Sequence, residues 1–240
     1  MPPRFAVTLH DVLASTNDTA KALAADGAAH GTTVCALRQT AGRGRLGRSW
    51  ISPPGNLHVS FVLRYDFGPA RQAELGFVAA LAAADLVDGN LPPGAGARLK
   101  WPNDVLVGDA KIAGILLEAD AAMAHAWLVL GIGINLAHAP ADLPYPVTSL
   151  AALGASVPTP QAALDQLLDA FAARLAAWES EGFAPVRAAW LQRGPAPGTP
   201  LRVATGAAAR DGEFLDLAED GALVLWTADG ALRISSGLVS

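Results

Sequence analysis

Cysteine is almost absent from the 240 residues, with Cys35 as the single example. One cysteine can form no intramolecular disulfide, and it leaves no cysteine cluster to bind a metal. The five histidines, at positions 10, 30, 58, 125 and 138, never occur in an H-x-x-x-H pattern. We therefore expect no metal site built on histidine or cysteine, and we expect each histidine to be a surface or satisfied core group. A site in which carboxylates bind Mg²⁺ is still compatible with the sequence.

Long apolar runs are missing as well. The uncharged apolar stretches at residues 77–84 and 126–136 are too short to cross a bilayer. The first residues, MPPRFAVTLHDVL, carry one arginine and reach His10 and Asp11 before any long apolar run, which is unlike a signal peptide. We expect a soluble, cytoplasmic protein with no membrane partner.

Lysine is scarce, since 14 of the 17 basic residues are arginine and only Lys21, Lys100 and Lys111 remain. With 22 acidic residues the net charge is −5, which argues against broad nucleic-acid binding because that needs a basic face. A local anion site is still compatible with this charge. Hydrophobic residues make up 52%, too many for a disordered chain, and the length allows one large domain with or without a small appendage.

The residue pattern predicts a mixed α/β body followed by a β tail. Ser15 has the features of a helix N-cap with Asp18 at the N3 position, and that helix is expected to stop at Gly27. Further helices are predicted at residues 71–87 and 158–178, with a last one ending at 188–192. Strands are predicted at residues 7–12, 32–38, 57–64, 98–101, 105–107, 112–119 and 126–136. After a proline-rich linker from Gly194, short strands at 201–204, 213–217, 223–226 and 231–234 predict a small barrel.

The first motif that carries chemistry is Q-T-A-G-R-G-R-L-G-R-S-W at residues 39–50. Three of the 14 arginines fall within six residues here and are interleaved with glycines. Glycine lets the backbone fold closely around a ligand, and the planar arginine fork matches phosphate or carboxylate. The pattern predicts a flexible anion-binding loop. A solvated arginine loop, or a glycine–arginine segment that touches RNA, is the alternative.

The second motif is K-W-P-N-D-V-L-V-G-D-A-K-I-A-G-I at residues 100–115, which holds two of the three lysines. A retained lysine in an arginine-rich chain suggests a position where a compact ammonium is needed. Lys111 precedes an apolar strand, so its charge would be partly desolvated and aimed at a pocket. Asp104 could pair with it or help to hold Mg²⁺. An ordinary hairpin with exposed lysines is the alternative.

Two shorter motifs complete the set. In G-I-G-I-N at residues 131–135, glycines in a buried strand would let a ligand lie against the backbone, with Asn135 bonding its polar edge. A strand packed closely under a helix explains these glycines equally well. For S-T-N at residues 15–17, the helix cap is the first interpretation, and binding of a polar ligand at the helix N-terminus is the second.

Taken in this order, S-T-N, Q-T-x-G-R-G-R-x-G-R-x-W, K-W-P-N-D followed by K-x-A-G-I-L-x-E, and G-x-G-x-N resemble the biotin–protein ligase family. The match extends to T-S-L at 148–150 and covers nearly the whole chain. The resemblance implies an α+β fold: a class II synthetase-like mixed β-sheet with flanking helices over residues 1–193, and a small Src-homology-like β-barrel over 194–240. Bifunctional members carry an N-terminal winged helix that binds DNA. Ser15 lies too near the start for one, so we expect no DNA partner and no repressor role.

The resemblance also implies roles for individual residues. The biotin-binding set it implies is Ser15, Thr16, Asn17, Gln39, Arg43, Gly44, Arg45, Lys111 and Gly114. Of these, Gly44 and Arg45 belong with Arg48 to a loop that orders over the adenylate, and Leu46 stands where some relatives place another arginine. Lys111 would meet the biotin carboxylate and the α-phosphate, and Asn135 would help to bind ATP. The implied catalytic residues are Lys111, Arg45 and Asp104.

The implied reaction converts biotin to biotinyl-5′-AMP with ATP and Mg²⁺, and then transfers biotin to a lysine of a biotin carboxyl carrier protein. That carrier would belong to acetyl-CoA carboxylase or a related carboxylase. A lipoate or octanoate ligase or transferase of the same superfamily is the nearest rival, and an inactive biotin-binding module is another. The −5 charge disfavours a nucleic-acid-binding module. Family members vary in oligomeric state, so a homodimer is left open.

Overall fold

The computed structural model describes residues 4–66, 68–120, 127–141, 143–206 and 208–239. Its helices are α1 (Thr16–Ala25), α2 (Pro69–Asn90), α3 (Pro160–Glu181) and α4 (Phe183–Arg193), with short 3₁₀ turns η1 (Arg45–Gly47) and η2 (Ala151–Leu153). Among the described residues, no helix is long and apolar enough to cross a membrane.

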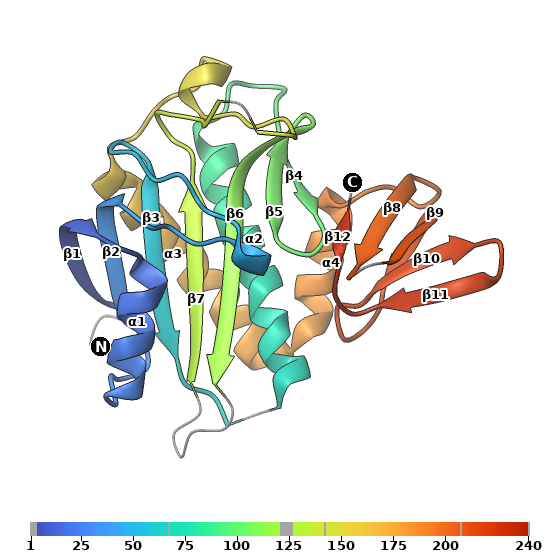
Figure 1. Cartoon of the computed structure of the whole chain (residues 1–240), viewed down its shortest axis with the longest axis horizontal. Helices are drawn as coiled ribbons and strands as arrows, with labels where there is room; N and C mark the ends of the chain where they lie inside the picture. The colour runs from blue at the N-terminus through green and yellow to red at the C-terminus, as the bar shows by residue number, and fades with distance from the viewer. Residues whose placement is uncertain (1–3, 67, 121–126, 142, 207, 240) are drawn as a thin grey trace.

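A seven-stranded mixed sheet forms the body of the molecule (Figure 1). Its strands are β1 (Ala6–Leu13), β2 (Thr32–Gln39), β3 (Leu57–Leu63), β4 (Ala97–Lys100), β5 (Asp104–Val107), β6 (Ala110–Asp120) and β7 (Trp127–Ile134). They are ordered β1-β2-β3-β7-β6-β5-β4, with β1 parallel to β2 and the other neighbours antiparallel. The central strands β3 and β7 are buried almost throughout, as their apolar sequences predict.

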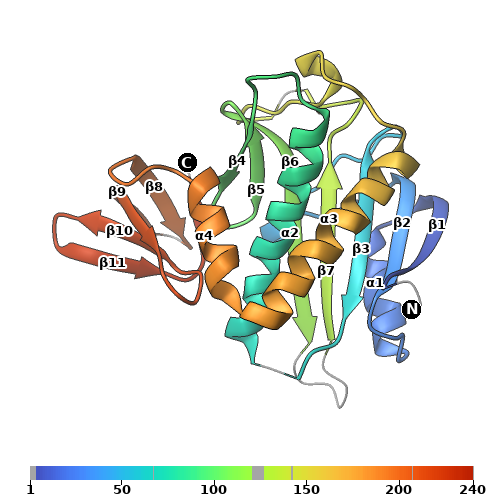
Figure 2. The ribbon, with the colours of Figure 1, turned by 180° about the vertical axis from the view of Figure 1, so that it is seen from behind.

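The two faces of this sheet are covered differently. Helices α2 and α3 pack on one face, where they bury Phe61, Leu81 and Phe171 (Figure 2). The opposite face carries α1, which packs through a smaller apolar cluster that includes Ala20 and Val62 (Figure 1). Because side chains alternate along a strand, odd-numbered residues of β3 enter the main core while even-numbered ones face α1. The rest of the α1 face is left for polar groups.

The C-terminal tail forms a second, antiparallel sheet. Its strands, in the order β11-β10-β9-β8-β12, are β8 (Pro200–Thr205), β9 (Ala208–Leu217), β10 (Leu223–Thr227), β11 (Gly230–Ile234) and β12 (Leu238–Val239). This sheet is joined to the body by a buried hydrogen bond from Trp101 Nε1 to the Gly221 carbonyl, at 3.0 Å. Its inner side chains, Phe214 among them, belong to the same apolar core as the large sheet.

The predicted helices and strands are present, and their ends shift by a few residues. Helix α2 begins at Pro69 and continues to Asn90, because proline suits a first helical turn and the alanine-rich stretch runs on past residue 87. The loop expected to be flexible contains η1, where Leu46 adopts a left-handed φ of 55°. The C-terminal strands pair as a five-stranded sheet with β11 and β12 at its edges, so the Src-homology-like barrel remains a prediction.

Candidate functional site

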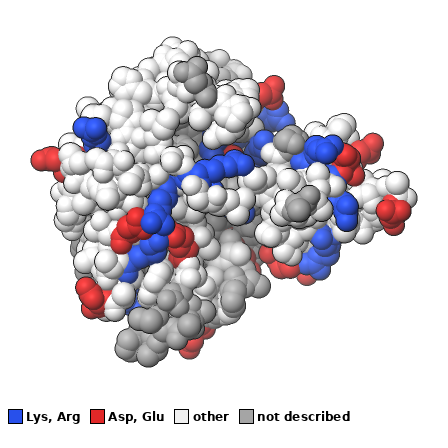
Figure 3. Space-filling model, viewed as in Figure 1, with Lys and Arg blue, Asp and Glu red and all other residues white. Residues whose placement is uncertain are grey.

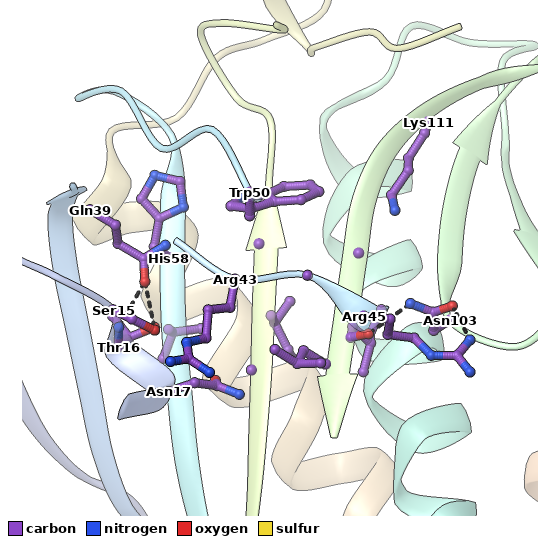
Figure 4. A pocket seen from close by; sticks show the side chains of 18 residues that line it. Ser15, Thr16, Asn17, Gln39, Arg43, Arg45, Trp50, His58, Asn103 and Lys111 are labelled. Carbon is purple, nitrogen blue, oxygen red and sulfur yellow. Dashed lines mark hydrogen bonds between the residues drawn. The ribbon is translucent and has the colours of Figure 1, made fainter. Parts of the chain in front are cut away.

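The N-terminus of α1 meets the end of β2 on the polar part of the sheet. Ser15 caps the helix as predicted, because its Oγ accepts a hydrogen bond from the Asp18 amide at 3.4 Å. Thr16 donates from its backbone N and its Oγ1 to Gln39 Oε1, at 2.7 and 3.1 Å. Gln39 Nε2 in turn donates to Ser52 Oγ at 2.8 Å. The S-T-N motif and the glutamine of the arginine loop therefore form one hydrogen-bonded group (Figure 4).

Glycines of the central strands form the floor of the site, and other side chains of the protein lie on it. Gly114 and Gly133 are register partners in β6 and β7. The Trp50 indole lies over both: a Cβ at Gly133 would come 2.5 Å from its Nε1, and one at Gly114 would come 3.2 Å from its Cζ3. The Asn17 amide occupies the space above Gly131. Side chains of the protein itself therefore pack closely against these glycines. Approach of a ligand to the same glycines stays a prediction.

Two polar residues of the site that the motif analysis missed come from β3. His58 and Ser60 are register partners of Gly133 and Gly131 and face the same side of the sheet. Ser60 Oγ lies 2.8 Å from Thr16 Oγ1 and 2.6 Å from Asn17 Oδ1. The signal in the sequence is L-H-V-S-F-V-L, where two polar residues alternate with apolar ones in an otherwise buried strand.

Ion pairs hold the first arginine of the loop beside α1. Arg43 Nε lies 2.9 Å from Asp18 Oδ2. Lys21 bridges Asp18 and Glu118, at 3.0 and 2.7 Å, and Asn17 Nδ2 donates to the second oxygen of Glu118 at 2.8 Å. Burial lowers the pKa of Lys21, but the hydrogen bonds and charges of Glu118 and Asp18 outweigh it, so the pKa is raised. Lys21 therefore stays protonated and connects the helix to β6.

Arg45 points toward the C-terminal sheet. Its Nη1 donates to Asn103 Oδ1 at 2.9 Å and to the Gly237 carbonyl at 3.4 Å (Figure 4). Asn103 is held in place because its Nδ2 donates to the Ile115 carbonyl at 2.9 Å. Burial lowers the pKa of Arg45, an effect that the Asp104 carboxylate opposes and Arg48 reinforces. An arginine keeps its proton under such conditions, so a desolvated cation lies at this end of the site.

Lys111 lies beside Asp104, which is one of the two roles weighed for that carboxylate, and it also lies beside Trp50. Its Nζ is 2.6 Å from Asp104 Oδ1 and 5.5 Å from the centre of the Trp50 ring. The contact with Asp104 is an ion pair rather than a well-aligned hydrogen bond, since that buried oxygen accepts none among the described residues. Backbone hydrogen bonds from Lys111 to Pro146 and from Thr148 to Lys111, both 2.9 Å, fix the start of β6. A partly desolvated ammonium therefore faces the cavity.

The Asn135 side chain is engaged in hydrogen bonds within the protein. Its Nδ2 donates to the Thr148 carbonyl at 3.0 Å, and its Oδ1 lies 3.5 Å from Asn56 Nδ2. The side chain is 2% exposed and joins the end of β7 to the T-S-L segment. It also borders a second cavity, which shares Trp50 and Lys111 with the main one. Its predicted contact with ATP stays a prediction.

Most of the predicted site residues line one cavity of about 50 Å³, which has room for water molecules. They are Ser15, Thr16, Asn17, Gln39, Arg43, Gly44, Arg45, Lys111 and Gly114. Asp104 does not line this cavity itself, but it forms an ion pair with Lys111, which does. Arg48 is exposed and borders a separate cavity beside the arginine loop. A band of basic side chains crosses this face of the molecule, in the region of η1, with acidic groups beside it (Figure 3). Across the described ranges, no three His, Cys, Asp or Glu residues are placed to hold a metal ion.

This arrangement combines a pocket of uncharged hydrogen-bonding groups at one end with half-buried cations at the other, which suits an elongated ligand that carries a carboxylate or phosphate. Residues 9–135 match the model of the biotin/lipoate A/B protein ligase family. The chain is 42% identical over 218 residues to a biotin–[acetyl-CoA-carboxylase] ligase of Paracoccus denitrificans, covering 88% of this chain and 90% of that one. It is 34% identical over 233 residues to the bifunctional ligase/repressor BirA of Bacillus subtilis, covering 95% of this chain and 71% of that one.

A solved structure agrees with these sequence matches. The biotin protein ligase from Aquifex aeolicus, in complex with biotin and ATP, superposes with a TM-score of 0.81 at 26% identity. The match covers 98% of this chain and 97% of that one. The chain belongs to the biotin/lipoate A/B protein ligase family.

Proposed function

We propose that this protein is an ATP-dependent biotin–protein ligase. It adenylates biotin to biotinyl-5′-AMP, releases pyrophosphate and then transfers the biotinyl group to a lysine of a biotin carboxyl carrier protein. The observation that carries the proposal is the convergence of a neutral polar pocket, built from Ser15, Thr16 and Gln39, with Arg43, Arg45 and Lys111 around one cavity. Two proteins that are similar to this one over 88% and 98% of its length bear the names of such ligases.

In this proposal the neutral pocket holds the uncharged head group of biotin. Hydroxyls, an amide and the N-terminus of α1 offer both donors and acceptors, which suits a cyclic urea. The polar groups of Ser15, Thr16, Asn17 and Gln39 form this end, and Arg43, paired with Asp18, lies at its border. The Trp50 indole and the Asn17 amide lie over Gly133 and Gly131, so entry of a bicyclic head group requires the loop that carries Trp50 to shift. Gly114 has no side chain, so nothing projects from β6 into the space beneath that loop at this position.

The cationic end serves the adenylation step. A biotin carboxylate oxygen attacks the α-phosphorus of ATP, and the bond from that phosphorus to the pyrophosphate oxygen breaks. Negative charge builds on the phosphate oxygens, where Lys111 and the loop arginines Arg45 and Arg48 stabilise it. Asp104 acts as a positioning residue, since its carboxylate holds the Lys111 ammonium at 2.6 Å. Mg²⁺ would enter with the phosphates of ATP. We assign the nucleotide to the side of the site where Asn135 borders the second cavity.

The second step needs the adenylate to be protected from water. The ε-amine of the carrier lysine attacks the acyl carbon, AMP leaves, and the amine loses a proton. Gly44, Arg45 and Arg48 belong to the loop that we propose closes over the intermediate and excludes water. The acceptor is the carrier protein of acetyl-CoA carboxylase or a related carboxylase, in the cytoplasm. Oligomeric state and the absence of a DNA partner stay predictions.

The finer description of the fold belongs to the same proposal. Residues 1–193 form a class II synthetase-like catalytic domain, and residues 194–240 form a small barrel of the Src-homology type. The hydrogen bond from Trp101 to Gly221 and that from Arg45 to Gly237 support a C-terminal domain that contacts the catalytic loop.

Pyrophosphate release tests the proposal. The purified protein is incubated with ATP and Mg²⁺, with biotin, with lipoate, or with neither, and we expect release that depends on biotin. Replacing Lys111 by alanine removes the ammonium at the reacting end and should lower that rate by about a hundredfold or more while the melting temperature stays close to wild type. Lys100→Ala, on β4 and outside the cavity, is the matched control that should keep its rate.

Other outcomes would redirect the assignment. Release with lipoate instead of biotin would move the protein to the lipoate branch of the family. Biotin binding without release would point to an inactive binding module. A wild-type rate in a folded Lys111→Ala variant would contradict the role assigned to that lysine.

A further inference from the structure

His58 is a buried polar residue of the site to which none of the motifs assigns a task. It lies in the middle of the large sheet, is 1% exposed, and faces the same cavity as Thr16 and Gln39 (Figure 4). Its register partner is Gly133, so no side chain from the neighbouring strand separates the imidazole from the glycine floor. The ring is therefore part of the cavity wall.

The hydrogen bonds of the ring determine which nitrogen carries the proton. His58 Nε2 lies 3.4 Å from the Pro53 carbonyl oxygen, which can only accept, so Nε2 donates. A neutral imidazole with a proton on Nε2 has an unprotonated Nδ1, which is an acceptor. Burial lowers the pKa of His58 to about 4, so the ring is neutral near pH 7. Nδ1 is buried and has no hydrogen-bond partner among the described residues.

Neighbouring polar groups do not supply that partner. Trp50 Nε1, which lies over Gly133, makes no hydrogen bond to Nδ1 and is itself buried without a partner among the described residues, while the two nearby amides are bound to other groups. The Gln39 amide is engaged at both ends, by Thr16 and by Ser52. The Asn17 amide is likewise engaged at both ends, by Ser60 and by Glu118. Buried polar atoms in proteins almost always have a partner, so an acceptor left open on a cavity wall indicates a donor supplied by whatever fills the cavity.

We propose that Nδ1 of His58 accepts a hydrogen bond from a ring N–H of the ureido head group, which makes His58 a specificity-determining residue for cyclic ureas. The inference rests on the proposed biotin ligase function and deepens it. The ureido ring carries two N–H donors, whereas the dithiolane ring of lipoate carries none. A dithiolane would leave Nδ1 buried without a donor, and a site built to hydrogen-bond its ligand rejects an analogue that lacks the matching group.

Two substitutions separate the hydrogen bond from the shape of the wall. His58→Leu fills similar space without an acceptor, and His58→Asn places an amide oxygen close to the position of Nδ1. We expect the KM for biotin to rise about ten- to a hundredfold in His58→Leu and to return to within about fivefold of wild type in His58→Asn. The KM for ATP and the kcat at saturating biotin should change less than threefold in both. A residue with a merely structural role would not produce this split.

A matched ligand pair gives a test in the unmodified protein. Calorimetry compares biotin with its two lactam analogues, in each of which one ureido N–H is replaced by CH₂. Wild type should bind one of the two lactams at least tenfold more weakly than biotin, and His58→Leu should bind that lactam and biotin equally, as expected for a pairwise interaction.

Two results would overturn the inference. One is a biotin KM within twofold of wild type in a folded His58→Leu. The other is equal affinity of the wild-type protein for biotin and both lactams, a measurement that stands even if the variants fail to fold. Failure of the proposed function looks different, since wild-type protein would then release no biotin-dependent pyrophosphate, whatever the His58 variants do.

Discussion

At the scale of single residues, the glycines of β7 are fixed by what lies above them. Gly131 and Gly133 leave room for the Asn17 amide and the Trp50 indole, and each of these side chains belongs to a motif far away in the sequence. A glycine in a strand usually weakens it, so its presence at two alternating positions indicates close approach by another group. Here that group is the protein's own binding machinery.

Gly131→Ala should therefore damage the site. A methyl group at this position collides with the Asn17 side chain and displaces it from Ser60 and Glu118. We expect a loss of about 1–3 kcal/mol in unfolding free energy and at least a tenfold weaker affinity for biotin, measured by thermal denaturation and calorimetry. The control is Gly76→Ala, inside α2 with open space around it, which should stabilise the protein by about 0.5–1 kcal/mol. Equal effects of the two substitutions would contradict this account.

His58 gives the protein a pH dependence of stability. Burial depresses its pKa from 6.5 to about 4, so between these values the unfolded chain binds a proton that the folded chain does not. Stability is then fully present above pH 6.5 and falls as the pH drops toward 4, by up to about 3 kcal/mol. Urea denaturation at pH 7.5 and pH 4.5 measures this loss. His58→Leu should show a smaller difference between the two pH values, and an unchanged difference would assign the effect to other groups.

At the scale of elements, the arginine loop is anchored in this structure through two of its arginines. Asp18 of α1 holds Arg43, while Asn103 and the Gly237 carbonyl hold Arg45. The next residue, Leu46, is 76% exposed and has a left-handed backbone, a conformation that costs free energy for a residue with a Cβ. A segment anchored in this way through polar groups can exchange those partners for the anionic oxygens of a ligand.

Arg45→Gly should leave adenylate formation partly intact but release the intermediate. The substitution removes both hydrogen bonds that Arg45 makes and a cation that would face the adenylate. We expect the half-life of enzyme-bound biotinyl-5′-AMP to fall at least tenfold, with indiscriminate biotinylation of a bystander protein such as serum albumin. Leu46→Ala, in the same loop but without these contacts, should retain the intermediate as wild type does. An unchanged half-life in Arg45→Gly would argue against a closing loop.

At the scale of the whole molecule, the C-terminal sheet and the body share one apolar core. Trp190 of α4 packs on Phe214 of β9, with ring centres 6.3 Å apart. Arg187 contacts the Leu217 carbonyl and the Asp216 carboxylate at the edge of the same interface. This continuity predicts that the two sheets unfold together rather than as independent units.

Trp101→Phe tests that coupling. It leaves the Gly221 carbonyl without its indole donor in a buried position, at a cost of about 1–3 kcal/mol in unfolding free energy. Hydrogen exchange should speed up in β9 and β10 as well as in β4. Trp226→Phe, at a side chain that is 56% exposed, is the control and should change stability by less than about 0.5 kcal/mol. Faster exchange confined to β4 would show that the sheets are not coupled in this way.

Much of this molecule follows from the sequence alone. Periodicity and turn residues predict its helices and strands to within a few residues, because those signals depend on neighbours along the chain. The Ser15 cap is local in the same sense. Four ordered motifs predict the family, and nine residues taken from them line one cavity.

Only the tertiary structure decided how these motifs meet. Asn17 lies on Gly131, Trp50 on Gly133, and Arg45 beside Gly237, contacts between residues separated by 83 to 192 positions. The tertiary structure also bound the Asn135 side chain to the Thr148 carbonyl. It left Nδ1 of His58, a residue of the cavity wall, without a hydrogen-bond partner among the described residues. The physical reason is that such contacts depend on which strands are neighbours and which face each side chain takes once the sheet has formed, and no pattern within one segment contains that information.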